Sequence, residues 1–216
     1  GTYLSTTLIG DKNNMGVAVN NLDYVPGLPD TEVSTKTHAG AEEEYVREVI
    51  RQSNIFSNSI IAAFLKQTTN KFTYPVNNKL GVALGVISRL ISAGLSTQMY
   101  IINIGGYDTH SGQLDGQSNL HQQLADAVYA FQRDLEGFGT DKKVSLMTIS
   151  EFGRRVVSNG TGTDHGSAAP MFVIGTGVKG GIIGTDPNLA TASRTAARTA
   201  RCAIAGASGR LLPCSM

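Results

Sequence analysis

The strongest structural signal in this sequence is a helical stripe of apolar residues between two short apolar runs. The stripe steps by three or four residues and ends at Gly139, a residue type that often follows the last helical turn; its members are Leu120, Leu124, Val128, Phe131, Leu135 and Phe138. The runs over residues 99–104 and 144–149 have the length and bulk of buried strands. Strand, helix and strand in this order predict a right-handed crossover between two parallel strands.

Similar patterns extend this unit in both directions. Apolar residues at near-helical spacing predict a helix that begins near Ala39, with a break at Ser53-Asn54 left open. Another helix is predicted from about residue 78 to residue 93, where Gly94 ends it. A third short strand is predicted over residues 171–174, followed by a glycine-rich turn. The alternation of helices and strands predicts an α/β domain.

Composition divides the chain into three parts. Residues 1–38 are rich in Gly, Asn, Asp, Thr and Pro, which predicts irregular structure, and residues 39–187 form the predicted α/β domain. Residues 188–216 are basic and rich in small residues, which favours a disordered or non-native tail over a helix with an arginine face for an anionic surface. Cys202 and Cys214 lie in this tail without a Cys-x-x-Cys motif, so a structural zinc cluster is not expected and a disulfide between them stays open.

Charge and hydropathy exclude two classes of partner. The 216 residues carry a formal net charge of +1, whereas a nucleic-acid-binding protein needs a marked excess of Lys and Arg. No stretch approaches the roughly 20 apolar residues that span a bilayer, so no transmembrane segment is predicted. The first residues have neither an initiator Met nor the layout of a signal peptide.

Asp108 and His110 follow the predicted strand 99–104 in a glycine-rich loop. Ligands of open α/β sheets bind beyond the carboxyl ends of the strands, which is where these two residues are predicted to lie. Residues two apart in an extended loop point the same way, so a carboxylate and an imidazole can face one zinc, manganese or iron ion. Alternatively, Asp108 caps the following turn and His110 hydrogen-bonds to the backbone.

Two further loops carry candidate site residues. Glu151 follows the predicted strand 144–149 and suits a metal ligand or general base, and Arg154 suits a clamp on a phosphate or sulfate oxygen. Glu151 and an arginine can instead pair with each other. His165 lies in a polar, glycine-rich loop and suits a metal ligand with Asp164 as its orienting partner, although both suit a simple turn.

Other chemistries are less well supported. A Ser150–His165–Asp108 triad is disfavoured because Ser150 lacks the Gly-x-Ser-x-Gly setting of a nucleophile elbow. His121 is predicted on the exposed flank of its helix. The glycine-rich segment 175–181 lacks the spacing of a phosphate-binding loop and is predicted to be a turn or hairpin.

Taken in order, these motifs resemble a known bacterial family. The motifs are Gly105-Gly106-Tyr107-Asp108-Thr109-His110-Ser111, Ser150-Glu151-Phe152-Gly153-Arg154-Arg155, Gly162-Thr163-Asp164-His165-Gly166, Ala169-Pro170 and Gly177-Val178-Lys179-Gly180-Gly181. Over residues 80–187 the chain closely resembles the family called domain of unknown function 1501, placed in the alkaline-phosphatase-like (sulfatase) superfamily. The resemblance implies a doubly wound, mostly parallel α/β sheet flanked by helices, and a site with one or two metals for phosphate- or sulfate-ester chemistry.

The resemblance also assigns roles by motif order. It implies that Asp108 and His110 bind one metal, that His165 completes that site, and that Glu151 stands where the superfamily has an Asp-His pair for a second metal. In this sequence Asp108 and His110 are closer together than the corresponding Asp and His of the superfamily. The superfamily also has an N-terminal strand that supplies a metal-binding Asp and a Ser or Thr nucleophile, and this strand has no counterpart in this sequence. Family members are longer and usually begin with an export signal. The chain is therefore expected to be a partial domain from a periplasmic or secreted bacterial protein.

The resulting hypothesis is a metal-dependent hydrolase of phosphate or sulfate esters. Its metal ligands are Asp108, His110 and His165, its catalytic residues are Glu151, Arg154 and Asp164, and its cofactor is a divalent zinc, manganese or calcium ion. Its substrate is a small-molecule or polysaccharide ester. The alternative is a non-catalytic protein that binds a cell-surface partner or polysaccharide on a degenerate superfamily scaffold.

Overall fold

The computed structural model describes residues 38–166, 169–184 and 202–205. The chain divides into two compact units, one that includes residues 38–68 and 93–96, and one that includes residues 69–92 and the chain from residue 97 onward. Residues 1–37 of the predicted irregular segment, and Cys214 with most of the predicted tail, lie outside the described residues. The predicted disordered or non-native tail stays a prediction, although it contains one described strand.

The first unit is built on α1, His38–Lys66. Its start confirms the helix predicted from near Ala39, and its backbone continues as one helix through residues 53 and 54. Arg47 and Glu43 form an ion pair of 2.8 Å one turn apart on its surface. At its C-terminal end, Lys66 Nζ donates to the carbonyl oxygen of Ala93 at 3.1 Å. A cation at this end also suits the negative pole of the helix dipole.

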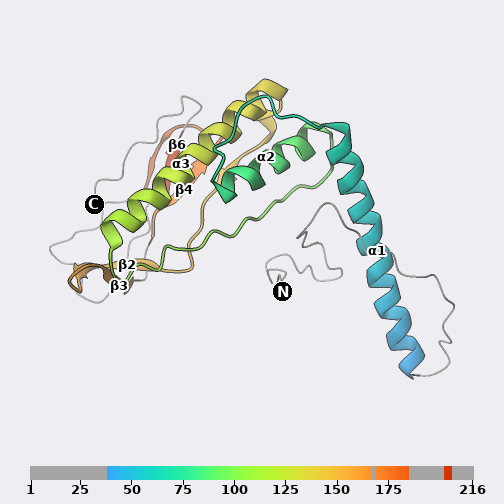
Figure 1. The fold of residues 1–216 in the computed structure, drawn as a ribbon, viewed down its shortest axis with the longest axis horizontal. Helices are drawn as coiled ribbons and strands as arrows, with labels where there is room; N and C mark the ends of the chain where they lie inside the picture. Colours follow the sequence, from blue (N-terminus) through green and yellow to red (C-terminus); the bar gives the residue numbers. More distant parts are fainter. Residues whose placement is uncertain (1–37, 167–168, 185–201, 206–216) are drawn as a thin grey trace. The chain divides into compact units, whose positions relative to one another are not determined.

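The second unit has its core between α2, Lys79–Ser92, and α3, Gln113–Phe138, which lie side by side (Figure 1). The buried cluster at their interface consists of Leu84, Ala127, Val128, Phe131 and Leu135. Gly139 follows α3 with a left-handed φ of 70°, and its N–H donates to the carbonyl oxygen of Glu136. Both helices and the role of Gly139 as a helix end are confirmed predictions.

Asn78 precedes α2, caps its first turn and also joins it to α3. Its side-chain oxygen accepts a hydrogen bond from Gly81 N at 3.1 Å, and its amide nitrogen donates to the carbonyl oxygen of Gln123 at 2.6 Å. Asn78→Ala is expected to lower the free energy of unfolding by about 2 kcal/mol, because a helix cap and a buried hydrogen bond are both lost. Chemical denaturation measures this loss. The exposed neighbour Asn77, replaced by alanine, is the matched control, and equal stability of the two variants would contradict the expectation.

Asp134 is a fully buried carboxylate on α3 that fastens the loop before α2. Its two oxygens accept hydrogen bonds from Asn70 Nδ2 at 2.7 Å, Lys71 N at 2.5 Å, Phe72 N at 3.0 Å and Tyr74 Oη at 3.0 Å. Burial, and then the charge of Asp134, raise the pKa of Tyr74, so its hydroxyl stays a donor. The loop therefore takes its shape from one acidic side chain.

The strands of the second unit are short. They are β1 Leu146–Met147, β2 Gly153–Ser158, β3 Thr163–Gly166, β4 Met171–Ile174, β5 Gly181–Ile183 and β6 Cys202–Ala205, with a short 3₁₀ helix at Asp141–Lys143 before β1. One sheet has the order β1-β4-β6-β5, and β2 pairs with β3 in a separate antiparallel hairpin. In the described part of the chain, β4–β6 is the parallel pairing and the three others are antiparallel. The strand at residues 171–174 and the turn after it are confirmed.

The predicted doubly wound, mostly parallel sheet is wrong. Residues 99–104 are not a strand, and of residues 144–149 only Leu146–Met147 forms one, antiparallel to β4. The structure is a mixture of helices and short, mainly antiparallel strands. Ile102 packs on the helical core, whereas Met99 and Ile101 are exposed. The segment therefore contacts the core through Ile102 but does not pair with any of the described strands. An apolar run indicates burial, but the backbone partner that makes it a strand lies elsewhere in the sequence.

Within the described residues, no helix has the length and apolar character needed to cross a membrane.

Candidate metal site

The candidate site forms where the loop before α3 meets the β2–β3 hairpin. Gln113, the first residue of α3, donates from its backbone N–H to the carbonyl oxygen of Thr161 at 3.0 Å and accepts from Thr163 Oγ1 at 2.9 Å. Gly162 lies against the same loop so closely that a Cβ atom on it would be 2.4 Å from the carbonyl carbon of His110. The hairpin and the loop are therefore in direct backbone contact.

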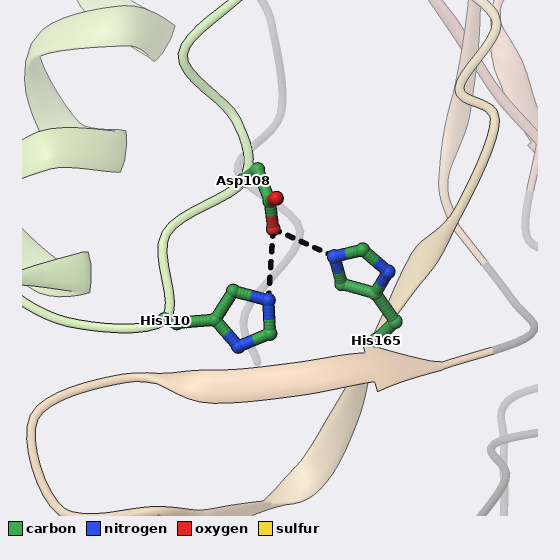
Figure 2. A group of neighbouring side chains, drawn as sticks. All are labelled: Asp108, His110 and His165. Carbon is green, nitrogen blue, oxygen red and sulfur yellow. Dashed lines mark hydrogen bonds and ion pairs between the residues drawn. The ribbon is translucent and has the colours of Figure 1, made fainter.

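This contact brings together Asp108 and His110 of the loop before α3 with His165, which lies on β3 and not in a loop as the sequence predicted (Figure 2). Oδ1 of Asp108 lies 2.6 Å from His165 Nε2 and 3.0 Å from His110 Nε2. The two imidazole rings are 4.9 Å apart between centroids. One potential ligand atom from each residue lies within 4.8 Å of the others, and each side chain is about half exposed. All three predicted metal ligands thus lie in one cluster at the surface.

The donor set suits a transition-metal ion, and the distances from Asp108 Oδ1 to the two imidazole nitrogens are close to those around one ion. Two imidazole nitrogens and a carboxylate oxygen are ligands for zinc, manganese or iron rather than for calcium, which prefers oxygen. Ligand atoms at about 2.0–2.1 Å from one such ion lie about 2.9–3.4 Å from each other. The distance of 3.0 Å from Asp108 Oδ1 to His110 Nε2 lies within this range. The distance of 2.6 Å from Asp108 Oδ1 to His165 Nε2 is slightly shorter, so these two atoms have to move apart a little when an ion binds.

Arg154 and Phe152 hold two members of this cluster. Arg154 Nη2 donates to Asp108 Oδ1 at 3.0 Å and to the carbonyl oxygen of Tyr107 at 2.5 Å, and Nη1 donates to the carbonyl oxygen of Thr163 at 2.7 Å. Phe152 stacks on the imidazole of His165 with centroids 4.1 Å apart and an interplanar angle of 10°. Both terminal nitrogens of Arg154 are thus engaged by the protein, and its side chain is only 15% exposed.

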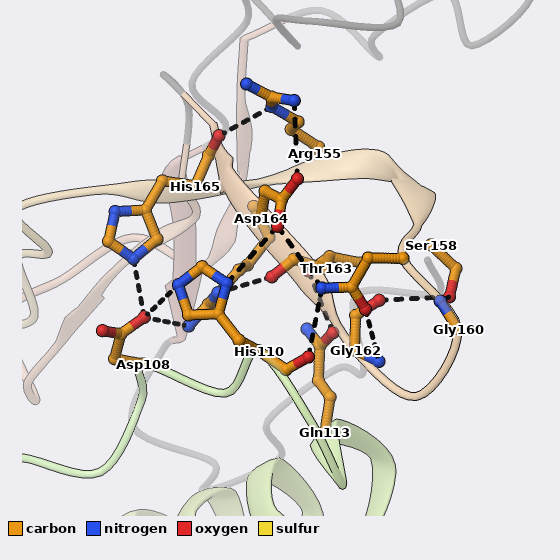
Figure 3. Close-up of polar contacts among 12 residues, drawn as sticks. Asp108, His110, Gln113, Arg155, Ser158, Gly160, Gly162, Thr163, Asp164 and His165 are labelled. Atoms are coloured by element: carbon orange, nitrogen blue, oxygen red, sulfur yellow. Dashed lines mark hydrogen bonds and ion pairs between the residues drawn. The ribbon is translucent and has the colours of Figure 1, made fainter.

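Asp164 contacts His110, although the sequence predicted it as the partner of its neighbour His165. Its Oδ1 atom lies 3.4 Å from His110 Nδ1 and 3.3 Å from Asn159 Nδ2 (Figure 3). Both Asp164 and His165 belong to β3, and successive side chains of a strand point to opposite faces. The carboxylate is therefore directed away from the imidazole next to it in sequence and toward His110 of the loop before α3.

Hydrogen bonds lower the pKa of both carboxylates of the site. The pKa of Asp108 is lowered, mainly by the hydrogen bond from His165 and against the effect of partial desolvation, with further help from Arg154. The pKa of Asp164 is lowered mainly by the hydrogen bond from Asn159. An ionised Asp108 is the form that binds a cation.

The remaining sequence candidates lie outside the cluster. Glu151 is exposed and is not one of the residues with clustered ligand atoms, so its role as ligand or base stays a prediction. Ser150 Oγ donates to the carbonyl oxygen of Phe152 at 2.6 Å, an arrangement unlike a triad. His121 is exposed on α3, as predicted, with its ring 5.7 Å from that of Tyr107.

Asn159, Phe152 and Gly162 were not predicted as parts of the site. Asn159-Gly160 is a common hairpin-turn dipeptide and could have located the turn between β2 and β3. Phe152 and Gly162 belong to the motifs of the family resemblance, but nothing in those motifs indicates their contacts, which are with residues distant in sequence.

The chain was compared with known protein families. Residues 86–201 match the model of a family described as "Protein of unknown function (DUF1501)". The matched segment includes the loop with Asp108 and His110, α3 and the hairpin with His165. No curated protein and no solved structure matches the chain.

Proposed function

We propose that this chain, which belongs to the DUF1501 family, binds a divalent transition-metal ion through Asp108, His110 and His165 and hydrolyses phosphate or sulfate esters with it. The observation that carries the proposal is the convergence of these three side chains, with ligand atoms within 4.8 Å of one another. The choice of esters rests on the order of the motifs, which resembles that of the alkaline-phosphatase-like superfamily.

The bound ion would supply charge stabilisation for the ester oxygens and a lowered pKa for a coordinated water or hydroxyl. Asp108 provides the negative charge of the ligand set, and the two imidazoles complete it. In this proposal Arg154 positions Asp108, because its terminal nitrogens already donate to protein oxygens. Arg154 is therefore assigned to Asp108 in this proposal and not, as the sequence predicted, to the substrate anion.

The exposure of the site bears on the kind of substrate. The side chains of Asp108, His110 and His165 are 57%, 48% and 47% exposed, so the three ligands leave one side open. Three protein ligands with open positions are typical of catalytic rather than structural zinc sites. An open surface site also gives access to an ester carried on a large molecule such as a polysaccharide.

Metal binding is the first test. Wild-type protein, which has all three ligands, is first stripped of metal with a chelator and then titrated with Zn²⁺. It is expected to bind about one Zn²⁺ ion per chain. His110→Ala or His165→Ala is expected to weaken binding by more than about 100-fold, since each removes a ligand rather than a supporting contact. His38→Ala is the control, because His38 is an exposed histidine of the first unit. Wild-type protein that binds no Zn²⁺ would refute the proposal.

Turnover is the second test. Hydrolysis of p-nitrophenyl phosphate and p-nitrophenyl sulfate is measured before chelation, after chelation and after the metal is restored. Activity that follows the metal supports the hydrolase. Tight metal binding without turnover of either ester would favour the non-catalytic alternative.

A further inference from the structure

His110 is held from two sides by residues outside the ligand cluster. Its ring nitrogen Nδ1 lies 3.4 Å from Asp164 Oδ1, and its carbonyl oxygen accepts a hydrogen bond from Asn159 Nδ2 at 3.1 Å. Its other ring nitrogen, Nε2, faces Asp108 at 3.0 Å. Figure 3 shows the imidazole between the two aspartates. The ring therefore has one nitrogen directed to the cluster and one directed to a separate carboxylate.

Asn159 contacts both the backbone of His110 and the carboxylate of Asp164. Its amide nitrogen reaches Asp164 Oδ1 at 3.3 Å as well as the backbone of His110, and its Oδ1 atom accepts from Gly162 N at 3.1 Å. Arg155 Nη1 lies 3.5 Å from the other oxygen of Asp164. One side chain of the hairpin turn thus fixes the His110 backbone and, with Arg155, the carboxylate that faces the His110 ring.

This arrangement has a chemical consequence for metal binding. A histidine ligates a metal through one ring nitrogen, and an acceptor at the other nitrogen fixes the orientation of the ring. His165 differs from His110 in this respect. Phe152 stacks on its ring, and within the described residues no carboxylate contacts its Nδ1 atom. The two imidazoles are therefore held by different means.

We propose that Asp164 and Asn159 are positioning residues for His110, which keep its Nε2 atom directed at the metal. Asp164 acts on the ring through Nδ1, and Asn159 acts on the backbone and on Asp164. This role rests on the proposed metal site, because a positioned ligand serves metal binding. The contacts of Asp164 and Asn159 with His110 belong to the protein itself and can be tested without a metal. We expect that loss of Asp164 disturbs His110 much more than His165.

The experiment compares Asp164→Ala and Asn159→Ala with Asn119→Ala, an exposed asparagine of α3. In metal-free protein, long-range ¹H–¹⁵N spectra report the ring nitrogens of each histidine. Asp164→Ala is expected to shift the ring nitrogens of His110 and to leave those of His165 near their wild-type positions. In Co²⁺ titrations followed by visible absorption, both site variants are expected to bind about 10–100-fold more weakly and with an altered band. Asp164→Asn keeps an acceptor oxygen and is expected to recover part of the affinity.

The outcomes separate the two proposals. Wild-type protein without a Co²⁺ band would refute the metal site, while the ring-nitrogen spectra would still decide whether Asp164 positions His110. If Asp164→Ala leaves the His110 ring unchanged, or shifts both rings equally, the positioning inference is overturned. If the spectra change as expected but Co²⁺ affinity equals that of Asn119→Ala, Asp164 does not serve metal binding and the inference fails at that step.

Discussion

Gly162→Ala is expected to weaken metal binding by about 100-fold while α2 and α3 keep their fold. A Cβ atom at residue 162 would lie 2.4 Å from the carbonyl carbon and oxygen of His110 and 2.7 Å from the carbonyl oxygen of Thr109. These are backbone atoms, so no side-chain rotation relieves the clash. The loop has to move away from the hairpin, and His110 moves with it relative to His165. Zn²⁺ titration measures the affinity, and far-UV circular dichroism checks the helices.

Gly105→Ala is the matched control for this substitution. Gly105 lies in the same loop segment, three residues before Asp108, and a Cβ atom there would have no neighbour within 4 Å. It is expected to keep the wild-type affinity within about twofold, as an ordinary surface substitution does. Equal affinities of the two variants would mean that the close contact at Gly162 does not set the ligand geometry.

The helices of the second unit were predictable because their signals are local. The stripe from Leu120 to Phe138 has its period and its glycine end within one segment, and α2 likewise begins at a capping Asn78. Helix hydrogen bonds join residues four apart, so the segment itself contains both partners. The same holds for the turn after β4.

The sheet was not predictable in the same way. Whether residues 99–104 form a strand depends on a backbone partner, and none of the described strands pairs with them. The prediction assumed that residues 144–149 were that partner. In the structure the β1 part of this run pairs with β4 instead, and β4 also pairs with β6. Strand pairing is a long-range property, and apolar content alone does not select it.

The three residues of the cluster were predictable from their types, but the residues that contact and position them were not. Asp108, His110 and His165 were identified from Asp and His residues in glycine-rich loops, and the structure brings the three together. The contact of Asp164 with His110 required knowledge that β2 and β3 form a hairpin against the loop before α3. Asn159 became significant only through that same contact.

Asp134→Ala is expected to lower the free energy of unfolding by about 3–5 kcal/mol, which is a large part of the stability of a small domain. The carboxylate is fully buried and accepts hydrogen bonds from two backbone N–H groups, the Asn70 amide and the Tyr74 hydroxyl. Alanine removes this acceptor from four part-buried donors, of which the Asn70 amide has a second acceptor, the carbonyl oxygen of Gly85 at 2.8 Å. Each lost hydrogen bond to a charged group costs about 1–3 kcal/mol. Urea denaturation followed by circular dichroism measures the change.

The position of Asp134 explains both the size of this effect and why sequence patterns do not reveal it. Asp134 lies three residues after Phe131 and directly before Leu135, so it belongs to the apolar face of α3, where a charge is expensive unless it is hydrogen-bonded. Asp126, on the same helix and hydrogen-bonded to Gln122 on an exposed face, is the control; Asp126→Ala is expected to change stability by about 0.5 kcal/mol or less. In Asp134→Asn, the amides of Lys71 and Phe72 are expected to exchange with solvent faster, because the acceptor charge that protects them is gone. Unchanged exchange at these two amides would show that the loop before α2 is held by other contacts.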